Sequence, residues 1–287
     1  MIPAALLAFR EGLEAALILG IVLSVLRRFG HADQARLVWL GSGLAALLSL
    51  AAGLGLYAMG ASLEGRAEEI FEGVAMLFAA GVLTWMISWM NHQGQAIQAQ
   101  LEADVRRTSA SGSKWAIFSL AFLAVFREGI ELALFLTAAA FTATAGATLV
   151  GGLLGLLLAV VAGWLILATT TRLNLQSFFR VTSILLIFFA AGLVAHGVHE
   201  LNEAGIIPSV VEHIWDINPV LDENSGVGQI LKALFGYNGN PSLTEVVAYI
   251  GYWVVVLLAL RHTRTRTRPA TARAQAQGTG SNQIGRA

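Results

Sequence analysis

The sequence predicts an all-α integral membrane protein of seven transmembrane helices, arranged as two inverted three-helix repeats plus a C-terminal helix. Three observations indicate this fold class. The 287 residues are 56% hydrophobic and 13% charged, with a mean hydropathy of +0.68, whereas soluble domains carry about 25% charged residues. Seven apolar runs approach the length of about 20 residues that spans a bilayer. One charged motif recurs in two of these runs.

The seven apolar runs set the bounds of the predicted membrane domain, residues 1–262. The predicted spans are 3–26, 36–59, 67–90, 115–141, 147–170, 178–204 and 243–261. We assign 1–90 to repeat one and 115–204 to repeat two, and 243–261 forms the separate seventh helix. The basic, polar segment 263–287 is expected to be a disordered cytoplasmic tail, because its composition offers no apolar core.

The polar segment 205–242 is predicted to be an outer loop rather than a span. It contains prolines and several glycines, which break regular helices. Short surface helices are expected in it around 210–217 and 226–236.

Basic residues predict the topology, because cytoplasmic loops of membrane proteins are enriched in lysine and arginine. With the N-terminus outside, 14 of the 18 basic residues fall in the inner loops and the tail. Two others lie in outer loops, and Arg10 and Arg127 lie within spans. We therefore expect a multi-pass protein of the cell membrane (inner or plasma membrane) with its N-terminus outside and its C-terminus in the cytoplasm. Its surroundings are the lipid bilayer, and no nucleic-acid partner is expected.

The internal repeat is indicated by two charged stretches, "FREGLEAALILG" at 9–20 and "FREGIELALFLT" at 126–137, which lie 117 residues apart. The second and fifth spans also share a stripe of small residues, which permits close helix packing in lipid. These residues are Gly41, Ala45, Ser49 and Gly53, and Gly151, Gly155, Ala159 and Gly163. Because three spans are an odd number, the second repeat must be inverted, as in many transporters whose site lies between the repeats.

The charged residues of each motif fall on neighbouring positions of a helix. Glu11 and Glu14 share one face, and Arg10 is beside Glu14. A charge in mid-bilayer costs at least about 2.5–3.5 kcal/mol, so such residues are usually functional. One arginine cannot neutralise two glutamates, and the surplus carboxylate favours a bound cation or proton. An intramembrane salt bridge that only joins two helices is the structural alternative.

The second motif repeats this arrangement with Glu128 and Glu131 on one face and Arg127 beside Glu131. The predicted metal ligands are therefore the four glutamates of the two motifs, supported by the two arginines. The ligands are Glu11, Glu14, Glu128 and Glu131, and the supporting residues are Arg10 and Arg127.

A second polar cluster is expected near the outer surface. The third span begins with glutamates, and the sixth ends with histidines and glutamates that form a single helical stripe. The predicted cluster consists of Glu68, Glu69, Glu72, His196, His199, Glu200 and Glu203. Together with acidic residues of the outer loop, this cluster is expected to form an acidic outer vestibule that concentrates cations. For the third span, a solvated helix start whose glutamates favour the helix dipole is an equally good interpretation.

The ligand chemistry narrows the cation to hard ions. The sequence contains no cysteine, which excludes thiolate sites, and carboxylate oxygens suit ferric iron as well as magnesium, calcium or manganese. A transporter of another divalent cation, exchanged for protons, remains an alternative. A membrane di-iron enzyme is a further alternative, although such bundles need glutamate and histidine ligands from facing helices.

The paired REG[LI]E motifs in the first and fourth of seven spans closely resemble those of the oxidase-dependent iron transporter family, the high-affinity ferric iron permeases of fungi and their bacterial relatives. The resemblance covers about residues 1–260 and includes "HGVHELNEAG" and "LFGYNGNPSLTEVVAYIGYW". It implies that the motif glutamates bind and pass iron. It also implies an extracytoplasmic partner that oxidises or binds iron, expected here as a separate protein.

The sequence thus predicts a permease and not an enzyme, importing iron, which is expected to be ferric where it enters. Iron is the transported substrate, and no permanently bound cofactor is expected.

Overall fold

The computed structural model describes residues 1–93, 114–168, 175–223 and 225–266. The chain forms two compact units, Met1–Tyr249 and Ile250–Ala287. The arrangement described below is that of the first unit. Of the second unit, the described part is the remainder of the last helix.

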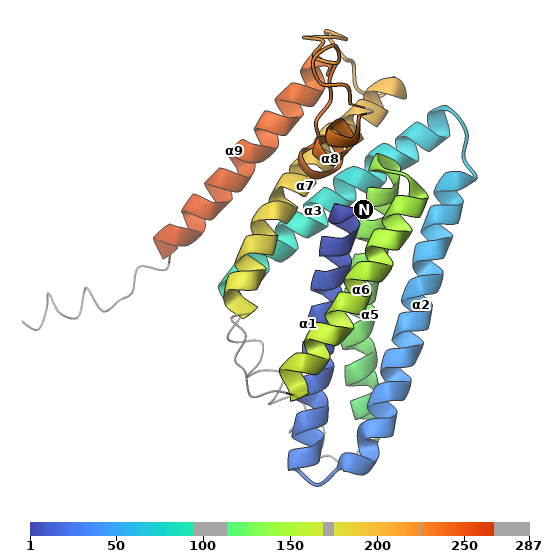
Figure 1. The fold of residues 1–287 in the computed structure, drawn as a ribbon, viewed down its shortest axis with the longest axis vertical. Helices are drawn as coiled ribbons and strands as arrows, with labels where there is room; N and C mark the ends of the chain where they lie inside the picture. The colour runs from blue at the N-terminus through green and yellow to red at the C-terminus, as the bar shows by residue number, and fades with distance from the viewer. Residues whose placement is uncertain (94–113, 169–174, 224, 267–287) are drawn as a thin grey trace, which may run out of the picture. The chain divides into compact units, whose positions relative to one another are not determined.

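The described residues form eight α-helices and one short 3-10 helix, with no strand among them (Figure 1). The α-helices are α1 (Ile2–Arg28), α2 (Ala35–Ala61), α3 (Arg66–Gln93), α5 (Lys114–Thr142), α6 (Ala145–Ala168), α7 (Leu175–Glu203), α8 (Gly226–Phe235) and α9 (Leu243–Arg266). The 3-10 helix, Ala32–Gln34, connects α1 to α2. The all-helical prediction is therefore confirmed.

Seven of these helices coincide with the seven predicted apolar runs, and four are long and apolar enough to cross a membrane. These four segments are Ala32–Ala61, Arg66–Met90, Ala145–Ile166 and Phe178–Glu203. The helices α1 and α5 are not among them, and each carries one arginine and two glutamates within its apolar stretch. Such helices indicate a multi-pass membrane protein.

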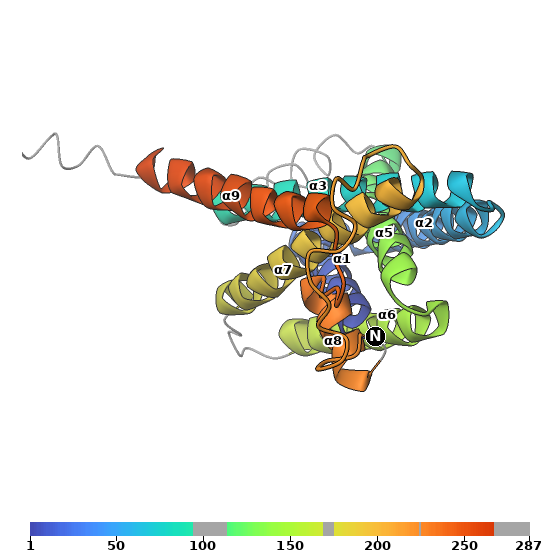
Figure 2. The same cartoon turned by 90° about the horizontal axis from the view of Figure 1, so that it is seen from above.

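The helices of the first unit pack crosswise between the two predicted repeats. Helix α1 packs mainly on α6, α2 mainly on α5, and α3 mainly on α7. Helices α1 and α5 also pack on each other, and Figures 1 and 2 show α1 between α5, α6 and α7. The first two helices of each predicted repeat thus find their main partners in the other one.

Small residues make two of these close approaches possible. A Cβ atom at Gly12 of α1 would lie 2.9 Å from the Cβ atom of Ala159 on α6. A Cβ atom at Gly73 of α3 would lie 2.8 Å from the carbonyl oxygen of Gly197 on α7. The second contact brings the start of α3 beside the end of α7, since Gly73 and Gly197 lie near those ends.

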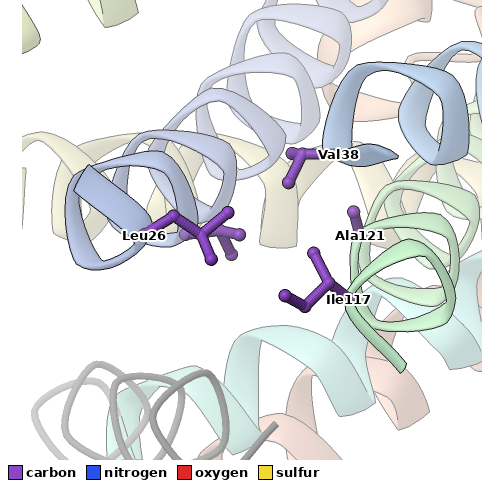
Figure 3. Packing of buried hydrophobic residues seen from close by; sticks show 5 residues of the cluster. Leu26, Val38, Ile117 and Ala121 are labelled. Atoms are coloured by element: carbon purple, nitrogen blue, oxygen red, sulfur yellow. The ribbon is translucent and has the colours of Figure 1, made fainter. Parts of the chain in front are cut away.

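An apolar cluster joins the end of α1 to the beginnings of α2 and α5. Figure 3 shows the inward-pointing side chains of Leu26, Val38, Ile117 and Ala121. Each of these residues is at most 2% exposed. The hydrocarbon side chains of this cluster fill the space between the three helices at this end.

The segment 205–242 differs in part from the predicted surface loop. The helix expected around 226–236 is present as α8. Ser225 caps its first turn, since its hydroxyl accepts a hydrogen bond from the Gly228 amide at 3.0 Å. The prediction of a helix around 210–217 is wrong, because these residues form bends and irregular backbone, with Val210 at a positive φ of 55°. Helix α8 does not lie free on the surface but packs on α7, α1 and α5.

Several predictions concern residues outside the described part of the chain. Arg106, Arg107 and Arg172 of the predicted inner loops lie there, as do the tail residues 267–287.

Candidate metal site

The first motif lies in the regular part of α1, where the helical repeat brings its charges together. The Arg10 Nε atom is 3.3 Å from Oε1 of Glu14, one turn later, and its Nη1 atom is 3.6 Å from Oε1 of Glu11. The side chains of Arg10 and Glu11 are 0% and 1% exposed. One guanidinium thus contacts both carboxylates of its own motif.

The second motif forms the same pattern in α5. Arg127 is 3.3 Å from Glu131 through Nε and 3.3 Å from Glu128 through Nη2. The Glu128 side chain is 3% exposed, whereas that of Arg127 is 48% exposed. The two motifs therefore match in their carboxylates and differ in the surroundings of their arginines.

The packing of α1 on α5 brings carboxylates of both motifs to one place. Glu11, Glu128 and Glu131 each offer an oxygen atom, and these oxygens lie within 4.8 Å of one another. Within the described residues, this is the only group of three or more carboxylate, imidazole or thiol side chains with such spacing. We call these three residues the carboxylate trio. Glu14, the fourth predicted ligand, lies next to Arg10 and outside the trio.

The buried oxygens of these glutamates lack hydrogen-bond donors. Both carboxylate oxygens of Glu11 and one each of Glu14, Glu128 and Glu131 have no hydrogen-bond partner in the described part of the chain. Buried carboxylates without donors are costly unless a cation or proton compensates them. Carboxylate oxygens are ligands of hard metal ions, so the residues present fit a metal ion as cargo.

A cavity of about 410 Å³ adjoins the trio. Helices α1, α2, α5 and α6 line it, and Glu11, Ser49 and Glu128 are among its few polar lining residues. The remaining walls are almost entirely apolar, for example Leu50, Leu132 and other aliphatic side chains. Two members of the trio, Glu11 and Glu128, thus lie at the edge of a hydrocarbon-lined space, where charges are weakly screened.

The end of α3 contacts both motif arginines. Nη2 of Arg10 donates to the Met90 sulfur at 2.6 Å. The Arg127 guanidinium carbon lies 5.4 Å from the centre of the Trp89 ring, a distance suited to a cation–π interaction. Sequence reasoning assigned neither residue to the site.

The predicted outer cluster does not form one compact group of ligands. The close crossing of α3 and α7 brings Glu72 within electrostatic reach of Glu200 and Glu68, and Glu200 within reach of Glu69 and Glu203. His196 is turned to its own helix, where its Nδ1 atom lies 3.0 Å from the Gly192 carbonyl oxygen. Among the described residues, no three of these groups approach one another as closely as the trio does.

His199 has a partner that sequence reasoning missed. Its Nδ1 atom is 3.0 Å from Oε1 of Glu245, which is 3% exposed and also accepts hydrogen bonds from Asn238 and the Ser242 amide. The Ser242 hydroxyl in turn accepts a hydrogen bond from the Glu245 amide. The sequence "SLTE" has the spacing of this capping box, so the helix start could have been found from it, but the contact with His199 could not.

Comparisons with known proteins identify the family of the chain. The sequence model of the family described as "Iron permease FTR1 family" matches residues 1–265. The chain is 37% identical over 257 residues to "Ferrous iron permease EfeU" of Escherichia coli O6:K15:H31 and to that of Shigella sonnei, covering 88% of this chain and 93% of each relative. It is 34% identical over 255 residues to "Ferrous iron permease EfeU" of Yersinia pestis, covering 88% and 90%.

No solved structure matches the chain. The family match over nearly the whole chain, together with these relatives, decides between transporter and enzyme. The chain belongs to the iron permease FTR1 family and is a multi-pass membrane transporter rather than an enzyme.

Proposed function

We propose that this permease imports iron across the cell membrane and that the carboxylate trio holds the ion on its way. The observation that carries the proposal is the convergence of Glu11 from α1 with Glu128 and Glu131 from α5, in which each glutamate keeps at least one buried oxygen without a hydrogen-bond partner in the described part of the chain. Glu14 supports the site from the next helical turn, and Arg10 and Arg127 each pair with the two glutamates of their own motif.

The proposal includes an inverted repeat of α1–α3 and α5–α7. The crosswise packing supports it, because α1 on α6 and α5 on α2 are equivalent pairs under such a symmetry, while α3 on α7 and α1 on α5 map onto themselves. The glycine contacts are equivalent as well, since Gly12 lies against Ala159 and Gly129 lies against Ser49. The trio then lies between the repeats, as in other transporters built in this way.

The proposed path runs from outside to inside through the trio. With the N-terminus outside, the start of α3 and the end of α7 face outward, and their glutamates attract cations there. The apolar cluster around Leu26 and Val38 then lies at the cytoplasmic end and closes it. Inward release requires this cluster to open.

Ferric iron is the first candidate for the transported ion, because a highly charged hard ion suits carboxylate ligands. If ferric iron is the transported ion, we expect an extracytoplasmic partner that oxidises or binds iron to deliver it. Ferrous iron is the second candidate. It is favoured by the names of the relatives, which are ferrous iron permeases.

The test is radioactive iron uptake by the purified full-length protein in sealed vesicles. We expect uptake that is lost in Glu128→Gln, with the variant present in the membrane in normal amount. Uptake with ascorbate, which keeps iron ferrous, is compared with uptake of chelated ferric iron, and excess manganese or zinc tests for another cation. Normal uptake by Glu128→Gln would indicate that the motifs serve only as structural salt bridges. Stronger transport of manganese or zinc than of iron would contradict the proposed substrate.

A further inference from the structure

The buried hydroxyl of Ser49 on α2 is a polar group for which the proposed function has no role. Ser49 is 5% exposed, and its Oγ atom has no hydrogen-bond partner in the described part of the chain. A buried hydroxyl without a partner costs free energy, so its position calls for a compensating ligand.

The neighbouring serine of the same helix shows what is unusual about Ser49. Ser42, also 5% exposed, donates its hydroxyl to the Val38 carbonyl oxygen one turn earlier at 2.8 Å. This bond within the helix is the ordinary solution for a serine in a membrane span. The Ser49 hydroxyl does not make the equivalent bond and is directed away from its own helix.

Ser49 and two carboxylates of the trio line one cavity, which Glu11 and Glu128 share with it. Ser49 also lies directly against Gly129, which follows Glu128 in the second motif. A Cβ atom at Gly129 would collide with the Ser49 hydroxyl. The absence of a side chain at Gly129 therefore gives this hydroxyl its place beside the second motif.

The other half of the molecule shows that packing does not require the hydroxyl. There the equivalent contact joins Gly12 of the first motif to Ala159 of α6, and the Ala159 methyl group and the Leu156 side chain fill the space without a polar atom. An alanine at position 49 would fill the corresponding space in the same way.

We propose that the Ser49 hydroxyl is a further oxygen ligand of the metal ion held by the carboxylate trio, contributed by α2 in one half of the molecule only. The inference rests on the proposed function of the trio. A neutral oxygen adds coordination without adding charge, which suits a site that already holds surplus carboxylates.

Two substitutions test the proposal on the purified full-length protein. Ser49→Ala should raise the iron concentration for half-maximal uptake by about five-fold, the cost of one neutral ligand bond, with little change in maximal uptake. Ser49→Cys replaces a hard ligand by a soft one in a chain with no other cysteine. It should bind cadmium, show thiolate-to-cadmium absorption and make cadmium a stronger inhibitor of iron uptake.

Ser42→Cys is the matched control, because it places a thiol in the same helix at equal burial but outside the cavity lining. It should show neither cadmium effect. Adding Glu128→Gln to Ser49→Cys should remove the cadmium absorption if both residues hold one ion. Cadmium absorption that is absent in Ser49→Cys, or equal in the control, would overturn the proposal.

The outcomes separate this inference from the function on which it rests. If the unchanged protein takes up iron and Ser49→Cys shows no cadmium absorption, then Ser49 is not a ligand and the proposed iron site is unaffected. A cadmium signal that depends on Glu128, in a protein that imports no iron, supports the ligand role and contradicts the proposed substrate.

Discussion

The two REG[LI]E motifs present nearly identical carboxylates and very different arginines. Glu11 and Glu128 are 1% and 3% exposed, and Glu14 and Glu131 are 13% and 12% exposed. Arg10, in contrast, is fully buried, whereas the Arg127 side chain is 48% exposed. The two copies of the motif are therefore nearly identical in the burial of their glutamates and differ in the burial of their arginines.

Helix α3 contacts the two arginines in different ways. Met90 accepts a hydrogen bond from Arg10, and the ring face of the preceding residue, Trp89, lies near the guanidinium of Arg127. We infer that Arg10 is a fixed structural counter-ion and that Arg127 is a counter-ion able to respond to the cargo.

The motifs also contribute unequally to the trio. The α1 motif provides Glu11 alone, while the α5 motif provides both Glu128 and Glu131. The sequence, in which the two motifs read almost alike, gives no sign of this inequality.

The largest expected difference is between the arginines. Removing one partner of a buried charge pair costs about 3–5 kcal/mol, and this cost is smaller for Arg127, because its half-exposed guanidinium is partly screened by its surroundings. Arg10→Gln should therefore sharply lower the yield and thermal stability of the detergent-purified protein, and Arg127→Gln should lower them less. Equal stability of the two variants, measured by size-exclusion chromatography after heating, would show that the difference in burial has no energetic meaning.

The next expected difference is between the glutamates. Loss of groups that only support metal ligands reduces metal affinity by about 10–100-fold, so loss of a ligand itself should cost at least about 100-fold. We expect Glu11→Gln, Glu128→Gln and Glu131→Gln to lower iron affinity by this amount, and Glu14→Gln by about 10-fold. Equilibrium binding of radioactive iron measures each value, and a Glu14 variant as defective as the other three would extend the site to all four carboxylates.

The smallest expected effect tests the surroundings of Arg127. A partly exposed cation–π interaction contributes about 0.5–1 kcal/mol, so Trp89→Leu should change the iron concentration for half-maximal uptake by about two- to five-fold. Trp89→Tyr should largely restore it. Trp85→Leu is the control, because Trp85 stacks on Trp89 at 6.5 Å and is not the residue beneath the arginine. An equal effect of both leucine variants would assign the change to packing.

The helices and the motif pairing could be predicted from the sequence because both follow from local periodicity. The apolar runs predicted seven helices with each end within five residues of the observed one, and the spacing of Arg10 and Glu14 predicted their ion pair. The choice of Glu131 over Glu14 for the trio, the contact of His199 with Glu245, and the place of Ser49 depend on how helices distant in the sequence cross. No local pattern encodes those crossings, and the small-residue stripe indicated only that α2 packs closely, without identifying its polar member.

Whether glutamates from both motifs hold one ion together is tested most directly by the stoichiometry of iron binding to the purified protein, with Glu11→Gln and Glu128→Gln measured side by side. The account predicts one tightly bound ion per chain, and the same ion is lost or weakened in both variants. Two ions per chain, of which each variant loses one and keeps the other at full affinity, would contradict it.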